Sequence, residues 1–350
     1  MTTSPATSPP SPTSGADSAP SVLPATVVGG WLGAGKTTLV NHLLRHAGGR
    51  RIAVLVNDFG EVSIDADLIE GADGGVLNLA GGCMCCSWGE DLFGTLERVR
   101  ARRPAPDVLL VETSGVAQPA AVARLLRLAP GVDVEGVIVL VDAETVRERA
   151  ADRYVGDLVR SQLAQADLLV LNKQDLVTSC EAAAVVQWLG AQTPGVRVAA
   201  ALRGRVEPEV VLGWPRGPAG ADVPAHTLSA QRDGRRRAGA AGLLGAGGTS
   251  GAATSWRRPE LSADERFESG MRHFDGPVDV AALAEELTAP GSRVIRAKGV
   301  LTALDGRPAL LQVVGRRAEI REFSGRPPAP DGRLVWIALR PPRPEEGAPA

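Results

Sequence analysis

Continuous runs of apolar residues recur through the first two hundred positions and are separated by glycine-rich or polar segments. These runs are R-I-A-V-L-V-N at 51–57, D-V-L-L-V at 107–111, G-V-I-V-L-V at 136–141 and D-L-L-V-L at 167–171. Runs of this length that are apolar throughout are typical of strands buried on both faces of a parallel sheet. A short β-branched run at 26–28 is followed by apolar residues at helical spacing. The pattern predicts an α/β domain with a mainly parallel sheet, to which residues 198–202 add a last strand.

The pattern changes near residue 203, where Gly, Ala, Arg and Pro become frequent without any period. Such composition is typical of a flexible linker. Further on, residues 279–287 have helical spacing and strands are expected at 292–302, 308–314 and 334–339, which indicates a smaller α+β domain. The predicted parts are a disordered tail at 1–24, the α/β domain at 25–205, a linker at 206–262, the second domain at 263–340 and a disordered tail at 341–350.

Charge and hydropathy exclude several classes of function. The 350 residues carry a net charge of −2, so no basic surplus indicates a nucleic-acid partner. The apolar runs are far shorter than the roughly 20 residues of a membrane-spanning helix. The first residues are rich in Ser, Pro, Thr and Ala and lack the features of a signal peptide, so we expect a cytoplasmic, reducing location.

Lysine is rare in this chain. Of 38 basic residues only Lys36, Lys173 and Lys298 are lysines. Because arginine is used elsewhere, these positions are expected to need a compact ammonium group instead of a planar guanidinium. The first two fall in the nucleotide motifs described below, and Lys298 is either a third such site or an ordinary cation at a strand edge.

The segment after the first strand satisfies the pattern G-x-x-x-x-G-K-[ST]. Its backbone N–H groups and the following helix N-terminus are suited to phosphate oxygens, with the lysine on the outer phosphates and the next threonine on Mg²⁺. The alternative is a glycine-rich turn without a ligand. The residues expected to contact phosphates and Mg²⁺ are Gly30, Gly33, Ala34, Gly35, Lys36, Thr37 and Thr38.

The motif E-T-S-G follows the strand at 107–111, at the edge where parallel sheets bind their ligands. Glu112 is expected to be the Walker B carboxylate, which holds Mg²⁺ directly or through water, and Gly115 to lie in a turn that senses the γ-phosphate. Together with Lys36 and Thr37, Glu112 is expected to act in hydrolysis.

The motif N-K-Q-D follows the strand at 167–171. The carboxylate of Asp175 is expected to accept two hydrogen bonds from guanine that adenine cannot offer, which selects GTP. Asn172 is expected to connect this loop to the phosphate loop, and the stem of Lys173 to cover the base. The motif is weak alone, but its position after a strand in a chain with a phosphate loop supports the interpretation.

Three of the four cysteines fall within four residues, in G-G-C-M-C-C, as Cys83, Cys85 and Cys86. Thiolates suit Zn²⁺ or Cu(I) and also hold Co²⁺ or Ni²⁺, whereas adjacent cysteines are poorly placed for a mutual disulfide. A tetrahedral ion would need a fourth ligand, for which Glu61, Asp58, water or a partner protein is available. Small buried residues or a redox sensor are the alternatives.

The order of these motifs, with N-D-F-G-E between the first two and R-A-K-G-V-L in the second domain, resembles the CobW family of P-loop GTPases. That family includes the zinc-regulated GTPase metalloprotein activators. The resemblance covers roughly residues 25–340 apart from the linker. It implies a metallochaperone that binds GTP and Mg²⁺, takes up Zn²⁺ or Co²⁺ through C-x-C-C and releases it to a client metalloprotein or a cofactor pathway. Family members often have Glu where this chain has Asp58, and many carry a His-rich stretch, whereas this chain has four His in total.

We expect the C-x-C-C loop to act as a switch, because it lies in sequence between two nucleotide-sensing segments. A regulatory GTPase whose structural zinc site serves as an interaction module is the first rival. A small-molecule kinase on the same scaffold is the second, although it would have little need of N-K-Q-D or of clustered thiols. The motifs leave the metal, the client and a monomeric or dimeric state open. The fourth cysteine, Cys180, is expected to be buried or half-buried.

Overall fold

The computed structural model describes residues 22–56, 76–78, 88–213, 267–323 and 332–340. Its first sheet has seven strands in the order β3-β2-β4-β1-β5-β6-β7, and every neighbouring pair is parallel. The strands are β1 (Leu23–Gly30), β2 (Ile52–Val56), β3 (Val76–Asn78), β4 (Val108–Glu112), β5 (Val132–Asp142), β6 (Leu168–Asn172) and β7 (Arg197–Ala200). The predicted α/β fold with a parallel sheet is confirmed.

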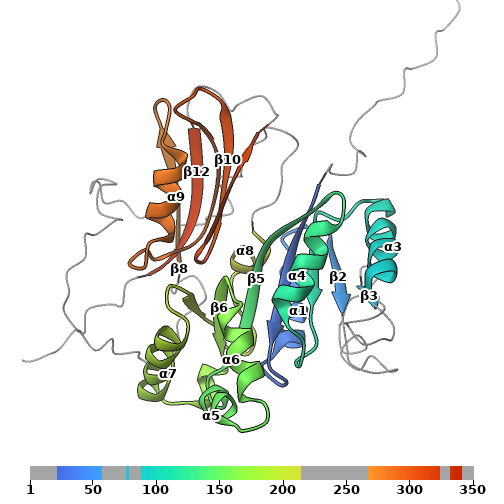
Figure 1. Cartoon of the computed structure of the whole chain (residues 1–350), viewed down its shortest axis with the longest axis vertical. Coiled ribbons are helices and arrows are strands. Elements are labelled where there is room, and N and C mark those ends of the chain that lie inside the picture. Colours follow the sequence, from blue (N-terminus) through green and yellow to red (C-terminus); the bar gives the residue numbers. More distant parts are fainter. Residues whose placement is uncertain (1–21, 57–75, 79–87, 214–266, 324–331, 341–350) are drawn as a thin grey trace, which may run out of the picture.

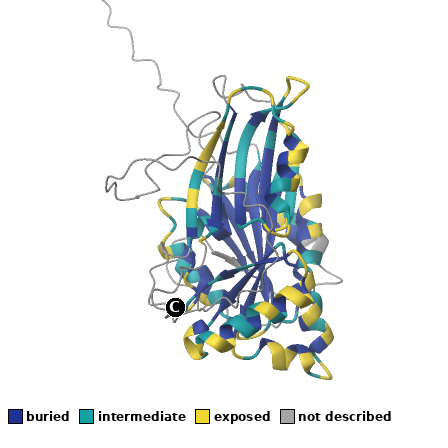
Figure 2. Cartoon of the chain, turned by 90° about the vertical axis from the view of Figure 1, so that its left-hand side faces the viewer, coloured by how far each residue is buried: buried dark blue, intermediate teal, exposed yellow. Residues whose placement is uncertain are grey.

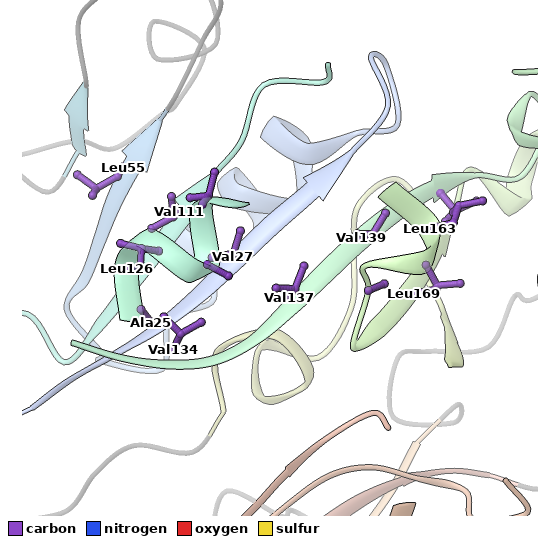
Figure 3. Packing of buried hydrophobic residues seen from close by; sticks show 14 of the residues in the cluster. Ala25, Val27, Leu55, Val111, Leu126, Val134, Val137, Val139, Leu163 and Leu169 are labelled. Carbon is purple, nitrogen blue, oxygen red and sulfur yellow. The ribbon is translucent and has the colours of Figure 1, made fainter. Parts of the chain in front are cut away.

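Helices cover both faces of this sheet because its strands are apolar on both sides (Figure 1). One face packs against α3 (Trp88–Ala101), α4 (Pro119–Leu128), α5 (Val146–Ala151), α6 (Gly156–Ala164) and α7 (Ser179–Gln192). Figure 3 shows part of this core, where side chains of β1, β4 and β5 lie beside those of α4 and α6. The opposite face packs against α1 (Lys36–Arg45) and the short helix α8 (Pro208–Leu212).

The second sheet has five antiparallel strands in the order β11-β10-β9-β12-β8. They are β8 (Phe267–Phe274), β9 (Val294–Thr302), β10 (Pro308–Val314), β11 (Arg317–Glu322) and β12 (Gly332–Leu339). Helix α9 (Val280–Thr288) buries its apolar stripe against one face of this sheet. The smaller α+β domain is therefore confirmed, and we call it the C-terminal lobe.

The two sheets share a hydrophobic core. Phe267, Ile295 and Ile337 of the C-terminal lobe pack in the same cluster as α1, α8 and the strands of the first sheet. Figure 2 shows buried residues continuing from one sheet into the other. This shared layer joins the two parts, and each part also has a hydrophobic cluster of its own.

The predicted linker at 206–262 begins too early. Residues 206 and 210–212 are buried, and the hydroxyl of Thr26 on β1 donates to the carbonyl of Val211 at 2.9 Å. A helix of five residues is too short to produce a visible hydrophobic period, which explains the error.

Within the part of the chain that the structure describes, no helix has the length and apolar character to span a membrane.

Candidate nucleotide-binding site

The phosphate loop connects β1 to α1 and depends on glycine at three positions. Gly30, Gly33 and Gly35 have φ angles of 134°, 74° and 100°. A Cβ at Gly30 would lie 2.4 Å from the carbonyl oxygen of Leu140, whereas Gly33 faces open space. Helix α1 begins at Lys36 directly after Gly35. The loop therefore presents free space in front of a helix N-terminus, the arrangement that binds phosphate groups.

Two oxygen groups suited to Mg²⁺ meet beside this loop. The hydroxyl of Thr37 on α1 donates to Oε1 of Glu112 at 3.0 Å. Glu112 is buried at the carboxyl end of β4, which pairs with β1. A hydroxyl beside a buried carboxylate is the hard donor set that Mg²⁺ prefers, so these residues fit the expected ion. Lys36 is also buried and completes the cationic part of the site.

The turn after Glu112 lies against the phosphate loop. A Cβ added to Gly115 would lie 2.7 Å from the backbone nitrogen of Leu32, so only glycine permits this approach. From the other direction, Gln162 on α6 donates to the carbonyl oxygens of Gly115 at 2.9 Å and Ala117 at 2.8 Å. The sequence motifs did not indicate Gln162, because it lies in the middle of an ordinary amphipathic helix.

Asn172 joins the loop after β6 to the phosphate loop, a contact that the sequence predicted. Its side-chain nitrogen donates to the carbonyl of Ala34 at 2.9 Å, and its side-chain oxygen accepts from the backbone N–H of Gly204 at 2.9 Å. Asn172 is buried, so both bonds form away from water. Gly204 in turn lies against the first turn of α1, since an added Cβ would be 2.9 Å from the nitrogen of Leu39.

Two ion pairs lie around this loop. Lys173, with a left-handed φ of 59°, places its ammonium 2.8 Å from the carboxylate of Asp142 at the end of β5. Asp175 lies 3.4 Å from the guanidinium of Arg203, whose side chain is largely exposed. Neither Asp142 nor Arg203 was singled out as a partner from the sequence.

A histidine on α1 connects the site to the segment that leads to α8. The ring Nε2 of His42 lies 2.9 Å from the carbonyl of Val206. Burial lowers the pKa of His42 below its ordinary value of 6.5, and the hydrogen bond to Val206 opposes this shift in part. The neutral ring with its proton on Nε2 satisfies that carbonyl.

The residues predicted to bind the transition metal, Cys83, Cys85, Cys86 and Glu61, lie outside the described residues, as does Asp58. Among the residues that are described, no group of three or more His, Cys, Asp or Glu side chains could hold a metal ion.

Two single-residue expectations are settled by the structure. Cys180 is exposed in the first turn of α7, so the expectation of a buried or half-buried thiol is wrong. Lys298 lies in the C-terminal lobe and donates to Glu135 of β5 at 3.0 Å. Its ammonium therefore belongs to an ion pair between the C-terminal lobe and the α/β domain that contains β5.

The parallel sheet, the glycine-rich loop before α1 and the Thr37–Glu112 pair define a P-loop nucleotide-binding protein. The family model of the CobW/HypB/UreG nucleotide-binding domain matches residues 24–199, and that of the cobalamin synthesis protein cobW C-terminal domain matches residues 267–345. The chain belongs to the CobW/HypB/UreG family.

Several known proteins are similar in sequence. The zinc chaperone CobW of Pseudomonas aeruginosa is 36% identical over 223 residues, which cover 55% of this chain and 60% of that protein. The zinc-regulated GTPase metalloprotein activator 1 of Schizosaccharomyces pombe is 33% identical, with 49% and 43% covered. The zinc chaperone YeiR of Escherichia coli is 37% identical, with 46% and 50% covered. The chain thus spans about half the length of the curated relatives it matches.

Proposed function

We propose that this protein is a GTP-hydrolysing metallochaperone that carries a transition metal, most readily Zn²⁺, to a client metalloprotein. The observation that carries the proposal is the assembly of three loops at one edge of the sheet, which Asn172 and the Thr37–Glu112 contact hold together. The names of the similar proteins, zinc chaperone and zinc-regulated GTPase metalloprotein activator, support the metal cargo. The clustered thiols suit a cytoplasmic protein, since thiols stay reduced there.

In this proposal each loop has one task toward GTP. The backbone of residues 33–38 binds the phosphates and Lys36 neutralises their outer oxygens. Thr37 and Glu112 hold Mg²⁺, which when bound neutralises the charge that develops on the phosphates. Asp175 accepts hydrogen bonds from guanine, and this contact favours GTP over ATP because adenine would leave the carboxylate unpaired.

The metal is the cargo, and its ligands are the thiolates of Cys83, Cys85 and Cys86, with Glu61 or water in the fourth position. In sequence these residues stand between the phosphate loop and Glu112. We infer that the third phosphate orders this segment and that hydrolysis relaxes it, so that metal affinity differs between the GTP and GDP states. By linkage the metal then tightens GTP binding by the same factor.

The test is a Zn²⁺ titration against a chromophoric chelator, with Mg²⁺ and either GDP or a non-hydrolysable GTP analogue. We expect tighter Zn²⁺ binding in the GTP-analogue state and loss of that binding in Cys85→Ala. Cys180→Ala is the matched control, because Cys180 is exposed on α7 and outside the cluster. Equal Zn²⁺ affinity in the two nucleotide states would remove the switch, and unfolding on chelation would favour the structural zinc site instead.

A further inference from the structure

Gln162 makes two buried hydrogen bonds that link α6 to the turn after β4. Its side chain is 1% exposed, and its amide nitrogen donates both protons, one to Gly115 and one to Ala117. An amide group has two N–H donors, so this donor capacity is fully used. The two acceptors lie 45 and 47 residues away in the chain, and the contact therefore depends on the fold and not on local geometry.

The turn that Gln162 holds is tight and has little freedom to move. The backbone nitrogen of Ala117 donates to the carbonyl of Ser114 at 3.0 Å, and Thr113 and Ser114 are buried. On its other side Gly115 approaches Leu32 of the phosphate loop so closely that an added Cβ would lie 2.5 Å from that side chain. Gln162 and Leu32 thus confine the turn between α6 and the phosphate loop.

A peptide carbonyl and the next N–H lie in one plane, so fixing the carbonyl also fixes the direction of that N–H. By fixing the carbonyls of Gly115 and Ala117, Gln162 sets the direction of the N–H groups of Val116 and Gln118. The N–H of Gly115 shares its peptide plane with the Ser114 carbonyl, which Ala117 holds within the same turn.

We propose that Gln162 is a positioning residue for the γ-phosphate response: from α6 it holds the Gly115 turn in the orientation that recognises the third phosphate. The inference rests on the proposed GTPase function. GDP lacks the group that this turn would contact, so Gln162 affects binding of GTP and not of GDP. A residue that only stabilised the fold would affect both nucleotides equally.

The test uses Gln162→Met, which keeps the length and volume of the side chain but removes both donors. Affinities for GDP and for a non-hydrolysable GTP analogue are measured with Mg²⁺ on the full chain. We expect the preference for the GTP analogue over GDP to fall about five- to tenfold, the equivalent of one neutral hydrogen bond, while GDP affinity stays within about twofold of wild type. Because the readout is a ratio, a partly unfolded sample does not change it.

Gln165→Met is the matched control. Gln165 directly follows α6 as its C-cap and bonds to Ala120, Gln118 and Ser161, but not to Gly115 or Ala117. The preference of Gln165→Met for the GTP analogue over GDP should equal that of wild type. An unchanged ratio in Gln162→Met, or an equal loss for both nucleotides, would overturn the inference. If wild type itself bound neither guanine nucleotide, the proposed function would fail first and the inference with it.

Discussion

The strongest single test of the architecture concerns Glu135 on β5, where the two lobes meet. Its carboxylate binds the guanidinium of Arg296 and the ammonium of Lys298, both on β9 of the C-terminal lobe. The side chains of Arg296 and Glu135 are 2% and 3% exposed. Arg296 also donates to the carbonyls of Val210 and Val211 on α8 at 3.0 and 2.9 Å. One buried charge cluster therefore connects three parts of the chain.

The expected effect of Glu135→Gln follows from the burial of its partner. Removing the carboxylate leaves the Arg296 guanidinium inside the protein with carbonyl partners only, and burial already lowers the pKa of this group. Breaking a buried ion pair at one side costs about 3 to 5 kcal/mol. We expect the lower part of this range, about 3 kcal/mol, because the carbonyls of Val210 and Val211 still accept hydrogen bonds from Arg296.

The assay is urea unfolding at pH 7, followed by far-ultraviolet circular dichroism and by tryptophan fluorescence. The two signals should coincide in one transition, since Phe267, Ile295 and Ile337 are packed in the core of the first sheet. Glu322→Gln is the control, because its pair with Arg307 is exposed and should contribute less than about 1 kcal/mol. Equal effects of the two substitutions, or separate unfolding of the two lobes, would refute the reasoning.

Three other substitutions test further parts of the structure. Gly204→Ala places a Cβ 2.9 Å from the nitrogen of Leu39 at a φ of 70°, so it should weaken GTP and GDP binding equally in calorimetric titrations. Asp175→Asn should lower GTP affinity by about tenfold or more and admit xanthosine triphosphate, as competition binding would show. Burial raises the pKa of Asp167 above its ordinary 3.8. The contribution of this raised pKa to the unfolding free energy is therefore fully present below about pH 3.8, and it is lost as the pH rises through the raised pKa. Asp167→Asn should therefore gain unfolding free energy relative to wild type as the pH rises above about 4, and a constant difference in denaturant titrations would contradict this.

The strands of the first sheet could be predicted from sequence because they are apolar on both faces. The run at 167–171, for example, is β6 displaced by one residue. In the C-terminal lobe the strands β9, β10 and β12 were anticipated, whereas β8 and β11 were not. These two lie at the edges of the second sheet, where most residues of each strand are exposed or half-buried and charged residues occur. Edge strands carry a weaker hydrophobic pattern, so periodicity alone did not reveal them.

The motifs supplied the residues that are predicted to contact the nucleotide, but not the residues that hold those side chains in place. Asn172 belongs to N-K-Q-D and its contact with the phosphate loop was expected, whereas Gln162 and Asp142 have no motif of their own. Their roles depend on which helix or strand end packs beside the site, and that is set by tertiary structure. The rarity of lysine pointed to Lys298 without indicating its partner, because Glu135 is 163 residues away.

The arrangement also limits how the nucleotide can influence the C-terminal lobe. Glu135 and Asp142 lie seven residues apart on β5, about 23 Å at the usual rise of a strand, and they contact Lys298 and Lys173 respectively. This distance exceeds the Debye length of about 8 Å at physiological salt, so direct electrostatic influence across it is weak. Any coupling between the nucleotide site and the C-terminal lobe must therefore pass through contacts between packed residues.

The segment 202–213 is suited to that task, since it is held at both ends. Gly204 bonds to Asn172 at the carboxyl end of β6, and Val206 lies within hydrogen-bond distance of His42 on α1. A few residues later the carbonyl of Val211 accepts from Arg296 of the C-terminal lobe. These contacts connect the loop after β6 to β9 through α8 over fewer than ten residues, whereas β5 pairs with β1 on one side and with β6 on the other.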